Sequence, residues 1–182
     1  LLEGIKLARK ADAKFLILAS VFGAMAFAIR KLEILVIPMP VPPLKMDLRG
    51  VPTFVGACIV PPQYAWIIGW AASGFDLVLE FGVDFTGWIP ACIVCSWLYR
   101  RLKGPLRKYP LLNPSLAMLI SQIVGNFCFL IPFMYVYSVP ITQLSNVLLI
   151  LLSRTVLTFF VAAPIVHAVE RRIGELMTWI ER

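Results

Sequence analysis

Charged side chains are scarce in this sequence, at 15% of 182 residues, whereas hydrophobic residues make up 60%. This usage, with a mean hydropathy of +0.85, lies well outside the range of soluble domains. It excludes a disordered chain, a collagen-like fold, a coiled coil and a disulfide scaffold. A stretch of 45 residues, Tyr109 to Ser153, carries no charge at all. The expected surroundings of the folded chain are therefore a lipid bilayer.

Residues typical of enzyme sites are also few. His167 is the single histidine, so neither a histidine-based metal site nor a Ser–His dyad deep in the membrane is expected. A Walker glycine loop is missing, which argues against ATP hydrolysis by this chain. Cys92 and Cys95 have the spacing of a redox or metal pair, but in an apolar run at helical spacing we interpret them as packing residues. The sequence predicts no catalytic residue, metal site or cofactor.

Apolar stretches predict an all-α, polytopic membrane protein with six transmembrane helices in a single domain. Pro61 and Pro62 predict a turn between the second and third spans, and residues 139–142 a turn within the long uncharged stretch. The spans are expected at 15–29, 51–60, 63–81, 85–99, 113–138 and 143–168, with an outer loop at 30–50 and a charged helix at 170–182.

Lysine and arginine are distributed unequally between the two sides of this arrangement. Twelve fall in the N-terminal segment, the 100–108 loop and the C-terminal tail, and four on the other side. This bias predicts that both termini are cytoplasmic. We therefore interpret the net charge of +7 as a signal that orients the protein in the membrane rather than as a nucleic-acid site. Binding to anionic lipid is a second interpretation. The N-terminal segment with Ala26-x-Ala28 also fits a cleavable signal peptide, but we expect a retained first span.

Arg154 is the remaining cation, eleven residues into the last span, where a charge costs at least ~2.5–3.5 kcal/mol and must face protein or a watery cavity. With a turn centred at Pro140, Asn126 and Arg154 each lie about 21 Å below the turn on neighbouring helices. They are expected to line one cavity, where the guanidinium would bind a ligand carboxylate or phosphate. The alternative is a structural tie, in which Asn126 and an acid such as Asp76 satisfy Arg154.

Two further features have both a structural and a functional interpretation. Asp76, Glu80 and Asp84 would form an acidic stripe at the outer end of the third helix if that helix continues so far. They are expected either to be solvated, or to attract cations or pair with Arg30, Lys31 or Arg49 across the outer surface. The segment 37–44 holds four prolines, which favour a stiff, extended strap. The strap either connects two spans on the surface or caps an outward-facing cavity.

Small residues recur in the first span at Ser20, Ala24 and Ala28, spaced by four. Such faces let helices approach closely in lipid. The face packs either inside this protein or against another membrane subunit.

With these features the chain resembles the S component of energy-coupling factor (ECF) transporters over nearly its whole length. The likeness rests on six spans, the alanine pair of the first helix and the outer strap. Two local stretches, 44–52 and 62–76, are similar to the family's loop entering the second helix and to its glycine-rich third helix. Trp66 and Trp70 depart from the family's pattern of smaller residues.

The resemblance implies a vitamin-binding subunit without catalysis, in the cell membrane of a prokaryote. Its partners would be a transmembrane T component, reached through the alanine face that begins at Ser20, and two ABC-type ATPases. Substrate contacts carried over by position are Arg154, Asn126, Asn146, Trp88 and Tyr135. A structural or assembly subunit of a larger membrane complex is the alternative function, and a thiol oxidoreductase using Cys92 and Cys95 ranks third.

Overall fold

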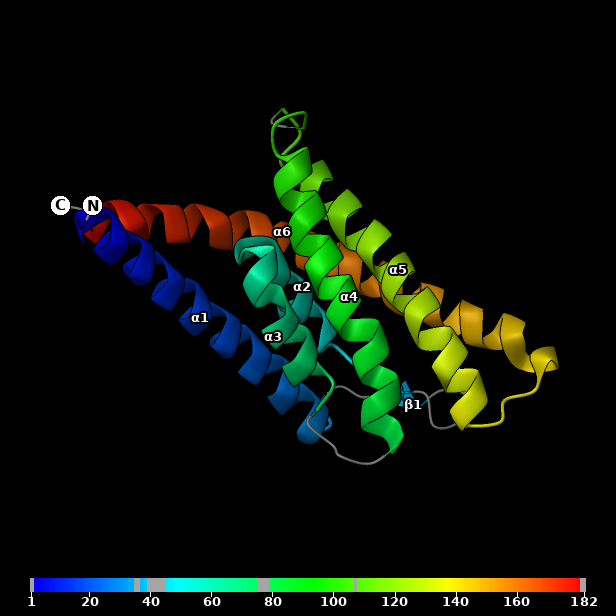
Figure 1. The fold of residues 1–182 in the computed structure, drawn as a ribbon. Helices are drawn as coiled ribbons and strands as arrows, with labels where there is room; N and C mark the ends of the chain where they lie inside the picture. Colours follow the sequence, from blue (N-terminus) through cyan, green and yellow to red (C-terminus); the bar gives the residue numbers. More distant parts are fainter. Residues whose placement is uncertain (1, 35–36, 39–44, 75–78, 107, 181–182) are drawn as a thin grey trace.

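The chain, seen in a computed structural model, is a bundle of helices (Figure 1). The structure describes residues 2–34, 37–38, 45–74, 79–106 and 108–180. The α-helices in these ranges are α1 (Leu2–Lys31), α2 (Gly50–Ile59), α3 (Pro62–Ala72), α4 (Leu79–Leu102), α5 (Leu112–Val136) and α6 (Leu144–Ile180). A single turn of 3-10 helix, η1 (Ile141–Gln143), precedes α6. In the outer segment, β1 (Ile37–Pro38) pairs antiparallel with β2 (Lys45–Met46).

Proline and glycine set the ends of α2 and α3. Val60 is extended, with φ −85° and ψ 152°, because a residue that precedes proline avoids the helical region. The predicted turn at Pro61 is therefore confirmed. The prediction of one helix over 63–81 is wrong: α3 ends at Ala72, and Gly74 adopts a φ of +92°, a left-handed conformation that stops the helix.

The end of α3 also changes the acidic stripe. Asp76 lies outside the described residues, and Asp84 belongs to α4. A continuous stripe on the third helix is therefore wrong. In the strap, residues 39–44 lie outside the described part, so its role as a cap stays a prediction.

Three helical segments are long and apolar enough to cross a membrane: Asp12–Lys31, Leu112–Val136 and Ile141–Arg172. The helix α2 has ten residues, or about 15 Å, which is too short for a hydrocarbon core of about 30 Å. The bounds of α2 nearly match the predicted residues 51–60, and its part in the six predicted crossings stays a prediction. The structure thus has the helices of a membrane protein, whereas six crossings and their orientation stay predictions.

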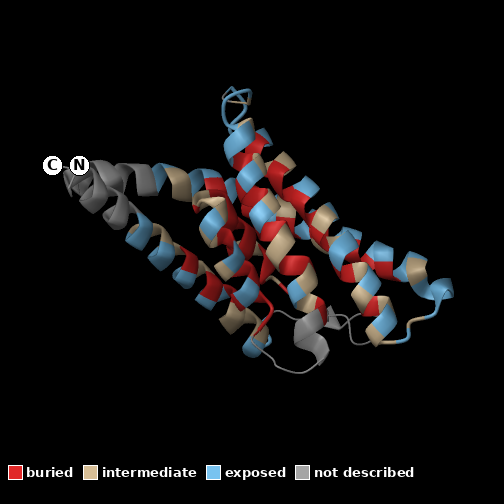
Figure 2. Cartoon of the chain, in the orientation of Figure 1, coloured by how far each residue is buried: buried red, intermediate tan, exposed pale blue. Residues whose placement is uncertain are grey.

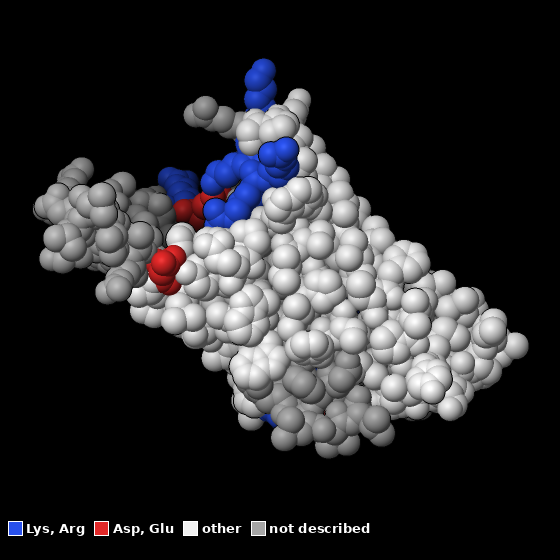
Figure 3. All heavy atoms as spheres, in the orientation of Figure 1, with Lys and Arg blue, Asp and Glu red and all other residues white. Residues whose placement is uncertain are grey.

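Polar contacts gather several helix ends at one end of the bundle. The Tyr99 hydroxyl of α4 donates to Glu170 Oε2 of α6 at 2.6 Å, and Arg100 Nη2 donates to the Ile59 carbonyl at the end of α2 at 3.1 Å. Asn113, near the start of α5, donates to the Tyr99 carbonyl at 3.1 Å. On the face in Figure 3, Lys and Arg gather at this end, and a broad surface beyond it is uncharged.

The opposite end brings together the end of α1, the end of α3 and the beginning of α4. Arg30 forms an ion pair with Asp84 and packs over Gly74. Since α4 starts at this end and finishes at the other, and α5 starts where α4 finishes, these helices run in alternating directions (Figure 1).

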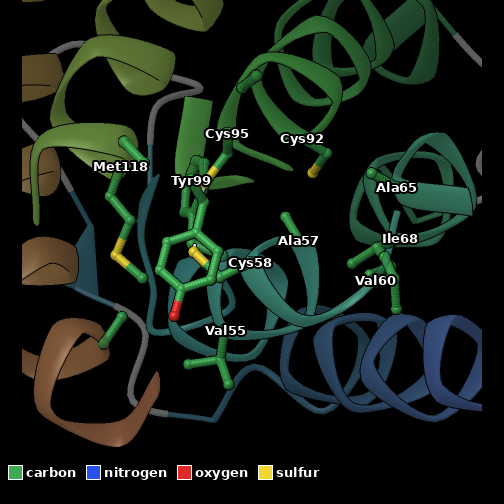
Figure 4. Packing of buried hydrophobic residues seen from close by; sticks show 14 of the residues in the cluster. Val55, Ala57, Cys58, Val60, Ala65, Ile68, Cys92, Cys95, Tyr99 and Met118 are labelled. Atoms are coloured by element: carbon green, nitrogen blue, oxygen red, sulfur yellow. Dashed lines mark hydrogen bonds between the residues drawn. The ribbon is translucent and has the colours of Figure 1, made fainter. Parts of the chain in front are cut away.

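The core surrounds α2, in which every residue from Pro52 to Cys58 is buried (Figure 2). Cys58 and Cys95 face each other there, with Sγ atoms 3.6 Å apart, and Tyr99 covers them (Figure 4). Cys92 and Cys95 are both buried in this apolar cluster. In contrast, α5 and α6 expose large apolar side chains such as Phe127, 65% exposed. Such surfaces suit lipid or a protein partner rather than water.

Candidate functional site

A cavity of about 30 Å³ lies between α2, α4, α5 and α6. Its polar lining consists of Asp84, Gln122, Asn126 and Arg154, and its apolar lining includes Phe54, Trp88 and Leu151. Gly87 of α4 and Gly125 of α5 also line it, where a Cβ on Gly125 would lie 2.8 Å from the Gly87 carbonyl oxygen. Glycine at these positions lets α4 and α5 approach closely beside the cavity.

Arg154 projects from α6 over the face of Trp88. Its Cζ atom lies 4.4 Å from the ring centroid, within the range of cation–π attraction. Trp88 is 5% exposed and also packs on Phe54, with ring centroids 5.8 Å apart. In the described part of the chain, Arg154 has no hydrogen bond or ion pair with another residue. Its N–H groups are thus available to a molecule in the cavity.

Gln122 supplies a second donor without a partner. The side chain is 6% exposed, and its Nε2 atom makes no hydrogen bond within the described structure. Leaving such a group buried and unpaired costs about 1–3 kcal/mol. Gln122 on α5 and Arg154 on α6 therefore line one small space, and no group in the described part of the chain accepts a hydrogen bond from Gln122 Nε2 or from Arg154.

Asn126 joins α5 to α6 beside Arg154. Its Nδ2 atom donates to Thr155 Oγ1 at 3.1 Å, and that hydroxyl donates to the Leu151 carbonyl at 2.8 Å. The structure places Asn126 and Arg154 on one cavity, as their equal distance from the turn at Pro140 predicts. The contact between Asn126 and Thr155 ties the two helices at this depth, whereas a ligand role for either residue stays a prediction.

A charged cluster adjoins the cavity through Asp84. Arg49 Nη1 donates to Asp84 Oδ2 at 2.9 Å, and Arg49 Nε lies 3.1 Å from Asp47 Oδ2. Arg30 also pairs with Asp84. Burial on its own lowers the pKa of the Arg49 guanidinium, but Asp84 and Asp47 outweigh burial and hold the pKa above its ordinary value. Arg49 is therefore charged, and its Cζ lies 5.1 Å from the Trp88 ring on which Arg154 also rests.

Two of the predicted contact residues are not at this cavity. Tyr135 is 86% exposed and absent from the lining. It follows Asn126 by nine residues, or two and a half helical turns, so it occupies the opposite face of α5. Asn146 is exposed and precedes Arg154 by eight residues, or about 12 Å along α6. Neither side chain therefore shares the cavity with Arg154, and their role as substrate contacts stays a prediction.

The small-residue face of α1 lies on the outside of the bundle. Ser20 and Ala24 are exposed and Ala28 is half-buried. The Ser20 hydroxyl donates to the Leu16 carbonyl of its own helix at 2.9 Å. Gly23, beside them, instead faces α3, where a Cβ would lie 2.9 Å from that of Ala71. Internal packing thus uses Gly23, and the face of Ser20 and Ala24 is left uncovered by the described residues.

Trp66 and Trp70, the departures from the family pattern, point outward from α3, with 44% and 39% exposed. Their size therefore does not disturb the packing of the bundle. Aromatic side chains at such positions are typical of the membrane interface.

Sequence reasoning missed Gln122 and the place of Asp84 on the cavity lining, whereas the alternative in which an outer acid pairs with Arg30 or Arg49 is confirmed for Asp84. Gln122 precedes Asn126 by four residues, so both lie on one face of α5. This spacing within an uncharged stretch was a signal that could have revealed Gln122. The contacts of Asp84 with Arg30 and Arg49 depend on how α1, α2 and α4 meet, which no local pattern specifies.

Comparison with known proteins provides no independent assignment. No protein-family model matches the chain, and neither the curated proteins nor the solved structures include a significant match.

Proposed function

We propose that this chain is the substrate-capture subunit of an ECF-type importer and binds a vitamin or similar micronutrient through an anionic group. The observation that supports the proposal is that Arg154 and Gln122 line one cavity with donors for which the described residues provide no hydrogen-bond acceptor. We place the protein in the cell membrane of a prokaryote, with both termini cytoplasmic and the cavity open to the outer side during capture.

Arg154 suits a carboxylate better than a neutral group. The guanidinium offers a planar set of donors that matches two oxygens of one acid group. Because Arg154 is half-buried, such a charge-assisted pair gains more than it would at a fully exposed position. Trp88 holds the guanidinium from one side, and the Gln122 amide can donate to the same anion.

The size of the cavity limits what it holds in this conformation. A volume of about 30 Å³ suits about two water molecules or a single acid group. Sites for complete small-molecule ligands are typically about 300–1,000 Å³. We therefore propose that the cavity anchors the acid group and that the helices around Trp88 separate when the remainder of the ligand binds.

Mass spectrometry of small molecules that copurify with the protein tests this proposal. The unaltered chain should carry an anionic compound that is missing from Arg154→Ala preparations of equal folded yield. Asn146→Ala is the matched control, because Asn146 lies on the same helix but is exposed and away from the cavity. Retention of the same compound by Arg154→Ala would remove the cavity from the binding site.

The exposed face at Ser20, Ala24 and Ala28 supports the proposed partners. Ser20 and Ala24 are small and uncovered, so another helix can approach the backbone of α1 closely. We propose that this face docks to the T component, which couples uptake to two ABC-type ATPases.

A structural or assembly subunit is the second candidate, and the small cavity is the observation that favours it. Two waters could satisfy Gln122 and Arg154 without any ligand. The candidates differ in the stability of Arg154→Ala. In a binding site the unpaired charge is costly without ligand, so its removal leaves the melting temperature of ligand-free protein unchanged or raises it. In a structural tie the same change lowers it.

A further inference from the structure

The exposed face of α4 changes in character towards the tip of the hairpin that α4 forms with α5. Three exposed residues follow one another at intervals of four and therefore share this face: Ile93, Trp97 and Arg101. More than half of the Trp97 side chain is exposed. Towards the tip, the face thus passes from an apolar to an aromatic to a cationic side chain.

The beginning of α5 repeats this order on the other arm of the hairpin. Ile120 and Leu112 are exposed and two turns apart on one face of α5. Closer to the tip, Tyr109 is more than half exposed, and the exposed Lys108 precedes it. In membrane proteins, apolar side chains face the hydrocarbon, aromatic side chains lie at the interface, and lysine and arginine extend towards the headgroups. Both arms therefore place lipid headgroups at the level of the tip.

The cations at the tip have no carboxylate of the chain as a partner. Among the residues that the structure describes, neither Arg101 nor Lys108 forms a hydrogen bond or an ion pair through its side chain. The carboxylate of Glu170, which lies at this end, instead pairs with Lys103 and accepts from Tyr99. Since Lys and Arg gather at this end on the face in Figure 3, the local potential is positive. Arg101 and Lys108 are thus available to an anion outside the chain.

We propose that the tip of the α4–α5 hairpin binds the headgroup of an anionic phospholipid through Arg101 and Lys108. The headgroup phosphate accepts from the two cations, and the acyl chains lie along the apolar residues of the same faces, such as Ile93 and Ile120. A lipid joins an anionic headgroup to apolar chains in the order in which the hairpin presents its side chains. An acidic protein surface would match the cations alone.

This inference does not depend on the proposed function. Arg101 follows Trp88 by thirteen residues on α4, so it lies about 20 Å along the helix from the cavity that Trp88 lines. The lipid site and the site at Arg154 can therefore be tested separately.

The test is the binding constant of brominated phosphatidylglycerol relative to brominated phosphatidylcholine. The full chain is reconstituted in vesicles that contain the two lipids in varied ratio, and bromine on the acyl chains quenches the fluorescence of nearby tryptophan. Trp97 lies one helical turn from Arg101, so its share of the quenching reports on lipid at the tip. This share is the difference between each protein and the same protein with Trp97→Phe.

A cation beside an anionic headgroup strengthens binding by about fivefold. At Trp97 the unaltered protein should therefore prefer phosphatidylglycerol by about 25-fold, and Arg101→Gln or Lys108→Gln should each lower this preference to about fivefold. The double change should abolish it. Lys31→Gln is the matched control, because it removes one exposed positive charge at the opposite end of the bundle and should leave the preference unchanged. A preference that survives the double change, or that falls equally in Lys31→Gln, overturns the proposal.

Free glycerol phosphate distinguishes a lipid from a soluble anion. It carries the phosphate without acyl chains, so at millimolar concentration it should leave the quenching of Trp97 unchanged. Displacement of brominated phosphatidylglycerol by glycerol phosphate would mean that the tip binds soluble anions, and the assignment to lipid would be wrong. If the unaltered protein binds both lipids alike, an acidic protein surface becomes the better partner for the two cations, and the proposal fails.

Discussion

Replacement of Gly69 tests whether the site depends on close contact between α3 and α4. A Cβ at Gly69 would lie 2.7 Å from the Trp88 carbonyl oxygen and 2.9 Å from Ile89 Cα. Both are backbone atoms, so no side-chain rotation relieves the overlap. Gly69→Val should therefore push α3 away from the turn of α4 that carries Trp88.

The expected loss follows from the two opposing effects of the change. Overpacking of a buried contact costs about 1–3 kcal/mol, and a collision with backbone belongs at the upper end of that range. Valine gains a few tenths of a kcal/mol, roughly 0.3, over glycine in helix propensity. The net loss in free energy of unfolding should be about 2–3 kcal/mol. For a chain of this size it corresponds to about 5–10 °C in melting temperature.

Thermal unfolding in detergent, followed by circular dichroism, measures this loss. Gly104→Val is the control, because a Cβ at Gly104 has no atom within 4 Å. It should change the midpoint by no more than about 2 °C. If Gly69→Val and the unaltered protein have the same melting temperature, α3 and α4 are not in backbone contact. The placement of Trp88, which follows from this contact, would then be refuted.

Three further changes test other parts of the structure. Gly74→Ala forces a left-handed conformation on alanine and places a methyl group against Arg30. The free energy of unfolding, measured by thermal unfolding, should therefore fall by about 1–3 kcal/mol. An unchanged free energy of unfolding would contradict the turn that ends α3. Tyr99→Phe removes the hydrogen bond to Glu170 and should lower the free energy of unfolding, measured by denaturant titration, by about 1–2 kcal/mol. An unchanged midpoint would mean that this bond between α4 and α6 does not stabilise the fold. Ala24→Trp should prevent copurification with the T component without altering ligand affinity, and normal assembly would argue against the face on α1.

Local signals in the sequence correctly predicted helix ends and turns where the covalent geometry of proline limits the backbone. The proline pair at Pro61 fixed the break between α2 and α3, and the uncharged stretch divided at the expected turn near Pro140. Because Asn126 and Arg154 are equally far from this turn, the sequence also predicted that both line one cavity. The early end of α3 was missed because a sequence does not reveal the positive φ of Gly74.

The composition of the site was less predictable, because it depends on which faces of the helices meet. Helix phase alone excludes Tyr135 from the face of Asn126, whereas Gln122 shares that face. The pairing of Asp84 with Arg30 and Arg49 brings together residues 54 and 35 positions apart in the chain. Such pairing follows from packing across α1, α2 and α4 and has no counterpart in local spacing.

The proposed function depends above all on a hydrogen bond from Arg154 to an anion in the cavity. Isothermal titration of the copurifying compound into ligand-free protein measures that contact directly, in the unaltered chain and in Arg154→Ala. A charge-assisted bond of about 1.5–3 kcal/mol predicts that Arg154→Ala raises the dissociation constant by about 10–150-fold at unchanged thermal stability. Equal dissociation constants in the two proteins would contradict the account.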